Sequence, residues 1–229
     1  MKQNTKLIAA CIIAILAACL SPYNGGNGGN GGTGLPNNGG GFDALSELFL
    51  PINDGTQNTT NFFTNDPKYR NPSGYTLWTY CSDASDFIER TVTVKKTLGN
   101  IRAGFGLVIC SNQRQINGQA QTVFLTVMIN NNQEYAVGKV IGASYTSLLP
   151  SLWYYSNRIN EGIGWENAIK IVKDNYDSNK YHLYINGYWV NDFSDNEQPQ
   201  CNGQGRNGYI VVIAQDDLNG GAVAVNFSE

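Results

Sequence analysis

Carboxylate and imidazole side chains are the groups that could do acid–base chemistry, and in this chain they are irregularly spaced. His182 is the only histidine, so a Ser-His-Asp or Cys-His centre would have to use it. Acidic side chains come close together in four places: Asp83/Asp86, Asp174/Asp177, Asp192/Asp195 and Asp216/Asp217. Because Asp favours turns by bonding to nearby backbone, we expect each of these pairs to lie in a turn.

Glu166 begins a predicted strand and is the one carboxylate placed to act as a lone acid. Glycoside hydrolysis needs two carboxyl groups, separated by about 5–5.5 Å for retention or about 6.5–9.5 Å for inversion. The sequence gives Glu166 no such partner, so we predict no catalytic residue. A carbohydrate-active enzyme that uses Glu166 or the turn aspartates stays open as an alternative.

Metal-binding residues do not show the spacing of a known site. His182 and the scattered cysteines cannot build a zinc cluster. Calcium would suit the Asp- and Asn-rich turns at 174–179, 192–196 and 216–219, but none has the regular D-x-D-x-D-G spacing. We therefore predict no cofactor, with calcium left open.

Three cysteines, Cys81, Cys110 and Cys201, lie beyond the N-terminal region. In an oxidising compartment two of them would pair and one would stay free. The sequence does not choose among the pairings, and three buried thiols are an equal alternative.

Aromatic side chains gather in a predicted long loop at 144–164, in Trp165 directly after it, and in a predicted hairpin around Asn186-Gly187. Flat rings stack on the apolar faces of sugars, and neighbouring polar side chains bond to hydroxyl groups. We predict that one ligand-binding surface is formed by Tyr184, Trp189, His182, Asn191, Trp165, Trp153 and Tyr155. The alternative is that these rings plug loops or cover the edge of the core.

The hairpin is the most clearly specified element, because Asn-Gly tolerates the positive φ angles of a type I′ turn. A two-residue loop pairs Ile185 with Tyr188, Tyr184 with Trp189, Leu183 with Val190, and His182 with Asn191. Alternation then turns the pairs Ile185–Tyr188 and Leu183–Val190 toward a core. It turns the pairs Tyr184–Trp189 and His182–Asn191 outward. Residues 168–172 predict a third strand beside the hairpin, joined to it by the turn-rich segment 174–180.

Short apolar runs at regular spacing predict about ten strands and almost no helix. Only Asp43–Leu50 has helical spacing, and Pro51 would end that helix. The other predicted strands are Tyr75–Tyr80, Phe87–Lys96, Gly104–Cys110, Gln121–Ile129, Glu134–Ile141, Tyr209–Ala214 and Gly221–Phe227. The fold class is therefore all-β, an antiparallel β-sandwich or barrel of two sheets.

Composition indicates an extracellular protein. The 229 residues are 41% hydrophobic but only 14% charged, with a net charge of −3. Low charge with abundant Tyr, Val and Gly suits an all-β domain. No basic cluster is present, so nucleic acid is excluded as a partner.

The N-terminus carries a targeting signal, with Lys2 and Lys6 before the apolar run Leu7–Ala18. Leu16-Ala17-Ala18-Cys19 resembles the lipobox of bacterial lipoproteins. The resemblance implies cleavage before Cys19 and attachment of acyl chains such as palmitate, which hold a protein on a membrane. An ordinary signal peptide with an incidental Cys19 is the alternative. We expect a signal peptide at 1–18, a lipidated Gly- and Asn-rich tether at 19–41 and one β-sandwich domain at 42–229.

Within residues 75–229, short motifs follow in a familiar order: AGFGLVI, ENAIKIV, YHLYINGYWV and GYIVVIA. This order resembles the concanavalin A-like lectin/glucanase superfamily, in particular its laminin-G-like and bacterial 3-keto-disaccharide hydrolase-like branches. The resemblance implies a jelly-roll sandwich, a fold that hosts lectins, hydrolases and adhesion modules. Glycosidases of this fold carry an E-x-D-x-E pattern on one strand, and this sequence has no such string.

These observations favour a bacterial lipoprotein on the outer membrane or cell surface. Its lectin-like sandwich would bind a glycan or a host or matrix protein without catalysis. An exported glycoside hydrolase-like enzyme and a purely structural envelope lipoprotein are the alternatives.

Overall fold

The computed structural model describes residues 48–53, 58–66, 75–80, 85–142, 144–196, 204–214, 217 and 221–229. The predicted signal peptide, Cys19 and the tether to residue 41 lie outside these ranges, as do Cys81 and Cys201. The described part contains fifteen β-strands. None of it forms a helix of the length and apolarity that crossing a bilayer requires.

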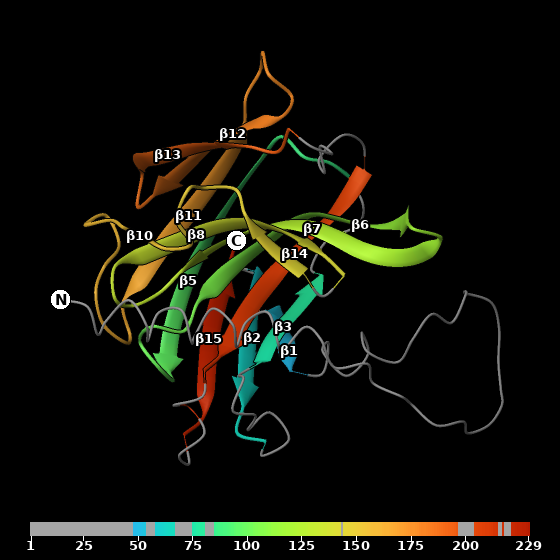
Figure 1. Ribbon diagram of the computed structural model, residues 1–229. Helices are drawn as coiled ribbons and strands as arrows, with labels where there is room; N and C mark the ends of the chain where they lie inside the picture. Colours follow the sequence, from blue (N-terminus) through green and yellow to red (C-terminus); the bar gives the residue numbers. More distant parts are fainter. Residues whose placement is uncertain are drawn as a thin grey trace, which may run out of the picture.

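The strands form two antiparallel sheets that pack face to face (Figure 1). The seven-stranded sheet has the order β1-β2-β15-β5-β11-β12-β13. Its strands are β1 (Phe49–Asn53), β2 (Asn58–Thr64), β15 (Val223–Ser228), β5 (Glu89–Leu98), β11 (Glu166–Lys173), β12 (Lys180–Ile185) and β13 (Tyr188–Ser194). The predicted fold class, an antiparallel two-sheet β-sandwich, is confirmed.

The eight-stranded sheet has the order β10-β8-β7-β6-β14-β3, with β9 paired to β8 and β4 paired to β14. Its strands are β10 (Tyr154–Tyr155), β8 (Glu134–Ile141), β7 (Gln119–Ile129), β6 (Phe105–Ile116), β14 (Gln204–Ile213), β3 (Tyr75–Tyr80), β9 (Ser144–Ser147) and β4 (Ser85–Asp86). The segment 144–164, expected to be one long loop, therefore contains the two short strands β9 and β10.

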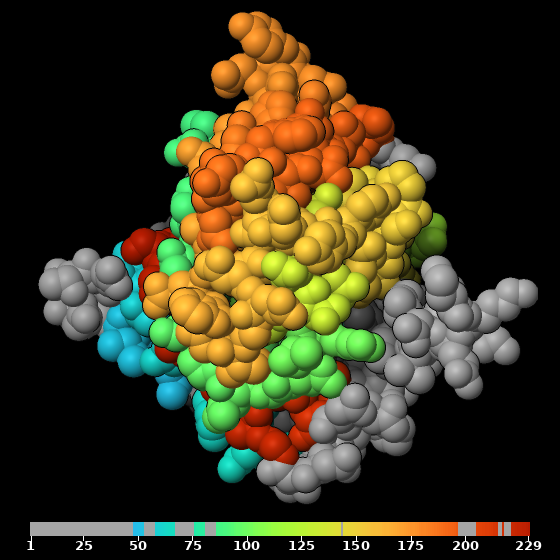
Figure 2. Space-filling model, turned by 90° about the vertical axis from the view of Figure 1, so that its left-hand side faces the viewer, coloured from blue at the N-terminus to red at the C-terminus, as the bar shows by residue number. Residues whose placement is uncertain are grey.

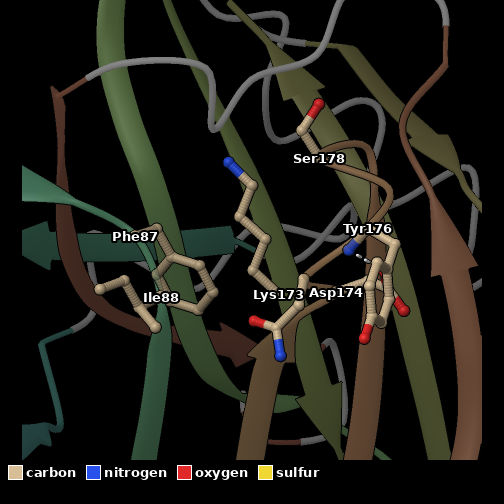
Figure 3. Close-up of a pocket in the computed structure, with 7 residues that line it drawn as sticks. Phe87, Ile88, Lys173, Asp174, Tyr176 and Ser178 are labelled. Atoms are coloured by element: carbon tan, nitrogen blue, oxygen red, sulfur yellow. Dashed lines mark hydrogen bonds between the residues drawn. The ribbon is translucent and has the colours of Figure 1, made fainter.

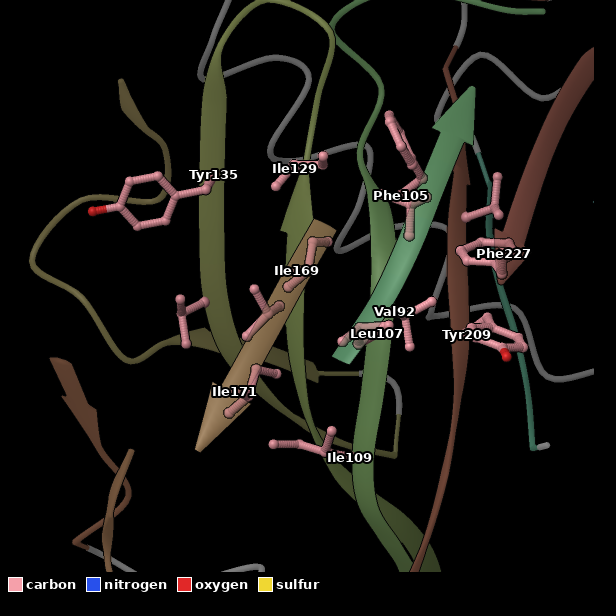
Figure 4. Packing of buried hydrophobic residues seen from close by; sticks show 14 of the residues in the cluster. Val92, Phe105, Leu107, Ile109, Ile129, Tyr135, Ile169, Ile171, Tyr209 and Phe227 are labelled. Atoms are coloured by element: carbon pink, nitrogen blue, oxygen red, sulfur yellow. The ribbon is translucent and has the colours of Figure 1, made fainter. Parts of the chain in front are cut away.

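The main core lies between the sheets and follows from period-two alternation. In β11, Ile169 and Ile171 are fully buried and their neighbours are only partly buried. These side chains and Val92 of β5 point toward Leu107 and Ile109 of β6 (Figure 4). Burial of such branched side chains stabilises the sandwich by about 1.5–3 kcal/mol each.

The eight-stranded sheet is apolar on its outer face as well. Val108, Phe124 and Met128 belong to a second buried cluster on that face. Trp78, Tyr145 and Trp153 pack against this cluster. Both faces of β6 and β7 are thus buried over much of their length, which explains their nearly continuous apolar runs.

The helix predicted at Asp43–Leu50 is wrong at its described end. Phe49 and Leu50 begin strand β1, and Pro51 lies inside that strand. Phe49 is buried, with its ring centroid 4.8 Å from that of Phe62 in β2. Pairing with β2 outweighs the helical spacing, and Pro51 is tolerated because β1 is an edge strand.

Cys110 is disulfide-bonded, so the alternative of three buried thiols is wrong. Its partner lies outside the described residues. Cys110 has a φ of 57° at a register shift in β6, between Ile109 and Asn112. This β-bulge re-aims the cysteine, and a bulge of this kind cannot be deduced from Cys spacing.

Candidate ligand-binding site on the β12–β13 hairpin

The hairpin tip has the predicted turn and pairing, but Tyr188, predicted to face the core, is exposed. Asn186 and Gly187 have φ angles of 52° and 81°, and the pairs Ile185–Tyr188 and Tyr184–Trp189 are confirmed. The Asn186 side chain accepts the backbone N–H of Ala168 at 2.8 Å and donates to the carbonyl of Arg158 at 2.7 Å. The turn residue therefore also fixes the hairpin to β11 and to the segment 144–164. Figure 2 shows the hairpin in orange directly above that segment in yellow.

The remaining predicted pairs are wrong because β13 contains a bulge. Leu183 pairs with Asn191, and His182 pairs with Asp192. The extra residue is Val190, which shifts the alternation of everything after it. A signal was present in the sequence: Val190 and Phe193 are three residues apart, so strict alternation cannot bury both. Phe193 is in fact buried, and its ring stacks on Tyr181 at 5.1 Å between centroids.

The bulge exchanges the residue that faces outward beside His182. Asn191, predicted for the outer surface, instead donates to the hydroxyl of Tyr135, a core residue of β8, at 2.9 Å. Asp192 takes its place and accepts from His182 Nδ1 at 2.8 Å. Sequence reasoning missed Asp192 because it assumed a straight strand.

His182 lies between two carboxylates. Its Nε2 is 2.9 Å from Asp174 Oδ2, and its Nδ1 is 2.8 Å from Asp192 Oδ1. Only the imidazolium can donate from both nitrogens. The hydrogen bond to Asp192, aided by that to Asp174, raises the pKa of His182 above its ordinary value, against a smaller effect of burial. The protonated ring therefore joins the turn after β11 to strand β13.

Both carboxylates of this cluster are held ionised. Backbone N–H groups of Asp177 and Tyr176, together with His182, lower the pKa of Asp174. For Asp192, partial burial acts in the opposite direction, but hydrogen bonds from Lys180, Trp189 and His182 lower its pKa well below the usual range. A glycoside hydrolase needs one carboxyl whose pKa is raised so that it can donate a proton. This pair lacks such a group.

Trp189 is exposed yet held in one orientation. The side chain has 59% of its surface exposed. Its Nε1–H donates to Asp192 Oδ1 at 2.9 Å, and Lys180 Nζ holds the other oxygen of the same carboxylate at 2.7 Å. Tyr184 lies opposite it on β12 and is half-buried. The indole thus presents an aromatic face to solvent with its edge already bonded.

The hairpin is tied to the other sheet through polar contacts between the layers. Lys139 of β8 and Asp195, directly after β13, form a buried ion pair with N–O distances of 2.7 and 3.0 Å. The Asn191–Tyr135 bond lies on the same two strands. These contacts position the edge strand that carries Trp189.

The other predicted site residues lie elsewhere. Trp165 is exposed immediately before β11, at the end of that strand opposite to Asp174. Trp153 packs on the outer face of the eight-stranded sheet, where Gly104 leaves room for its ring. Tyr155 is exposed in β10 and donates to Gln133 Oε1 at 3.2 Å. The structure therefore brings together Tyr184, Trp189 and His182, and separates the rest.

The acidic residues that were predicted to lie in turns do so only in part. Asp174 and Asp177 accept backbone N–H groups two residues ahead, as predicted for Asx turns. Asp86 and Asp192, also predicted in turns, instead lie inside strands β4 and β13. Glu166 is paired with Lys95 at 3.4 Å. Asp83 and Asp216 lie outside the described ranges, and among the residues inside them no His, Cys, Asp or Glu cluster could hold a metal ion.

A cavity of about 360 Å³ opens beside the turn between β11 and β12 (Figure 3). Phe87 and Ile88 stand on one side, Tyr176 and Asp174 on the other, with Lys173 between them. Asn175 and Ser178 complete its lining. Sequence reasoning missed Tyr176, although it is the single aromatic ring in the turn 174–180 and is fully exposed.

Comparison with solved structures gives the fold type. The chain is similar to the GH16 protein of a Bacteroides ovatus mixed-linkage glucan PUL, in complex with the product G4G4G3G. The TM-score is 0.53, with 8% identity over 80% of this chain and 85% of that one. The chain is also similar to a family 16 endo-glucanase from Bacteroides ovatus in complex with G4G3G-2F-DNP, with a TM-score of 0.52, 8% identity and coverage of 80% and 85%. The fold is a concanavalin A-like jelly roll.

This confirms the fold that the sequence resemblance implied, and at such low identity it shows the fold alone. A carbohydrate-binding module, CBM66 from Bacillus subtilis, matches with a TM-score of 0.47 and 12% identity over 66% of this chain and 78% of that one. No protein-family model matches the sequence, and no curated protein is similar to it.

Proposed function

We propose that this protein is an exported, lipid-anchored protein whose jelly roll binds a glycan or a host or matrix protein without catalysis. The observation that carries the proposal is Trp189, an exposed ring fixed by a hydrogen bond to Asp192. A ring that is already ordered loses little conformational freedom on binding, so it is suited to stacking on a ligand. His182 and Tyr184 lie beside it on β12.

The charge state of the cluster supports binding over hydrolysis. The pKa values of Asp174 and Asp192 are both lowered, so neither carboxyl is protonated near neutral pH. Glu166 is exposed and paired with Lys95. The cluster therefore organises a surface rather than an acid–base pair.

The structural neighbours support a glycan as the ligand class. The two glucanase structures with TM-scores above 0.5 hold gluco-oligosaccharides. Their likeness to this chain concerns the fold. It makes an oligosaccharide the first class of ligand to test, with matrix proteins second.

The N-terminal sequence supports display on a membrane. Apolar residues 7–18 end at Cys19, which a lipobox would mark for acylation. The Gly- and Asn-rich residues that follow would act as a flexible tether. We place the domain on a bacterial outer membrane or cell surface on this ground.

The direct test is binding of the purified full chain to glycan arrays and matrix-protein arrays. Trp189→Ala should weaken binding to any ligand that the wild type retains by about 3- to 10-fold, the range expected for one aromatic contact. Tyr155→Ala is the matched control, because Tyr155 is also an exposed aromatic residue but lies on the other sheet. Equal loss in both variants, or no loss in Trp189→Ala, would contradict the proposed surface.

A further inference from the structure

The cavity beside Tyr176 and the ring of Trp189 are joined by one chain of hydrogen bonds. Asp174 lines the cavity and bonds to His182, which in turn bonds to Asp192. Asp192 accepts the indole N–H of Trp189. These groups belong to successive elements of one sheet: the end of β11, then β12, then β13.

The spacing of these elements matches an extended ligand rather than a single sugar. Strands β11 and β13 are two strand spacings apart, and Trp189 is level with Tyr184 and Lys170, four residues before Asp174. With about 4.8 Å between strands and about 3.3 Å per residue along them, the backbone positions of Asp174 and Trp189 are roughly 16 Å apart. A monosaccharide cannot contact both. A short oligosaccharide laid across the strands can.

Tyr176 gives the cavity a second stacking surface. Its side chain is fully exposed at the wall of the cavity, opposite the apolar side chains of Phe87 and Ile88 (Figure 3). Asn175 and Ser178 bring amide and hydroxyl groups to the same opening. The lining therefore offers one exposed ring for stacking and several polar groups that can bond to sugar hydroxyls.

The charges of this cluster are paired within the protein, which indicates an uncharged ligand. Lys180 interacts with Asp192, Asp174 and Asp177, and His182 bonds to Asp174 and Asp192. The Asp174 and Asp192 carboxylates each already accept three hydrogen bonds within the protein. Three aspartates face the two cations Lys180 and His182, an arrangement that disfavours an acidic sugar.

We propose that the cavity and Trp189 are two ends of one site for an uncharged oligosaccharide. One sugar ring enters the cavity against Tyr176, and another stacks on Trp189. This inference rests on the proposed glycan-binding function and adds the extent of the site and the class of ligand.

The test is calorimetric titration of the full chain with gluco-, xylo- and manno-oligosaccharides, from monosaccharide to hexasaccharide. Affinity should rise steeply once the ligand is long enough to reach both rings. Tyr176→Ala should weaken binding of the longer oligosaccharides by about 3- to 10-fold and leave short ones unaffected. The substitution keeps the backbone N–H that bonds to Asp174, so the turn should fold normally.

Two results would overturn the inference while leaving glycan binding intact. In the first, Trp189→Ala weakens binding of long oligosaccharides but Tyr176→Ala does not. In the second, sulfated or uronic-acid oligosaccharides of equal length bind more tightly than uncharged ones. Absence of any glycan binding by the wild type would instead overturn the proposed glycan function itself, and Tyr155→Ala again serves as the control for nonspecific loss.

Discussion

Asp192 organises the candidate site at the scale of single residues. It accepts from a lysine, an indole and an imidazole that come from two strands. None of these bonds occupies the face of the Trp189 ring. Asp192 is therefore a positioning residue that keeps its neighbours ready for a ligand.

The first prediction concerns the pKa of His182. The hydrogen bond to Asp192 is the largest of the effects that raise this pKa. We therefore expect the folded-state pKa of His182 to be above 6.5 in the wild type and closer to 6.5 in Asp192→Ala. His182 is the only histidine, so its ring protons give a single set of NMR signals to titrate against pH. A wild-type His182 pKa at or below 6.5 would contradict the placement of His182 between two carboxylates.

The raised pKa of His182 also makes the free energy of unfolding depend on pH, in a direction set by proton linkage. His182 binds its proton more tightly when folded, so its contribution to stability is fully present below pH 6.5. It is lost as the pH rises through the folded-state pKa. In Asp192→Ala this pH-dependent step in the free energy of unfolding should shrink.

A second prediction concerns Lys96, whose ammonium group is fully buried and donates to the carbonyls of Asn100 and Ala103. Burial lowers the pKa of Lys96 to about 8, although Asp217 opposes the shift. Between pH 8 and pH 9.5 the unfolded chain therefore holds more protons, and stability should rise with pH.

The expected rise is about 2 kcal/mol over that range, at about 1.4 kcal/mol per pH unit for one proton. Denaturant unfolding at several pH values measures it. Lys96→Met should remove most of the rise. A wild-type stability that falls between these pH values would show that Lys96 is not the dominant titrating group.

At the scale of elements, the hairpin is held by buried polar contacts as well as by its own pairing. Strand β13 has one neighbour in its sheet, β12. Lys139 and Asp195 link it to the opposite layer, where an unpaired charge would be costly.

The third prediction follows from this ion pair. Lys139→Met should lower the free energy of unfolding by about 3–5 kcal/mol, because it leaves Asp195 buried without its partner. The double variant Lys139→Met/Asp195→Leu should recover most of that loss, since it buries no charge. Chemical denaturation of the four proteins of this cycle measures both effects. Equal destabilisation in the single and double variants would argue against the ion pair as the cause.

Sequence predicted elements well where the instruction is local. Asn186-Gly187 defines its turn through φ angles that few residues tolerate, and the alternation of Ile169 and Ile171 defines β11. Prediction failed where distant pairing decides. Phe49 lies in a strand because β2 is beside it, and Val190 bulges because Phe193 must reach the core.

The candidate site was predicted in part for the same reason. Tyr184, Trp189 and His182 lie within one hairpin, so local alternation places them together. Asp174 and Tyr176 join them through the turn before β12, and Asp192 joins them through a bulge. Trp153 and Trp165 stand apart because the segment 144–165 runs from one sheet to the other.

At the scale of the whole molecule, function is proposed to depend on an anchor as well as a binding face. A flexible chain from Cys19 to the domain would have a root-mean-square reach of about 25–30 Å. That length would separate the jelly roll from a bilayer without fixing its orientation. The surface that carries Trp189 could then meet ligands from several directions.

The fourth prediction tests the anchor. Cys19→Ala should abolish incorporation of a palmitate analogue and move the protein from the membrane fraction to the soluble fraction, because the acyl chains supply the membrane affinity. Radiolabelling followed by fractionation measures both. Cys11→Ala is the control, since Cys11 lies within the predicted signal peptide. Unchanged labelling of Cys19→Ala would mean that the cysteine is incidental.

The place of β15 has a consequence for the order in which the protein can form. This strand, the last along the chain, lies between β2 and β5, and its Phe227 is fully buried. Until the chain through Ser228 is present, β2 and β5 have no partner to join them and the sheet stays split. A polypeptide with this layout completes its core only once its last strand is available, a property that would suit the export proposed for this protein.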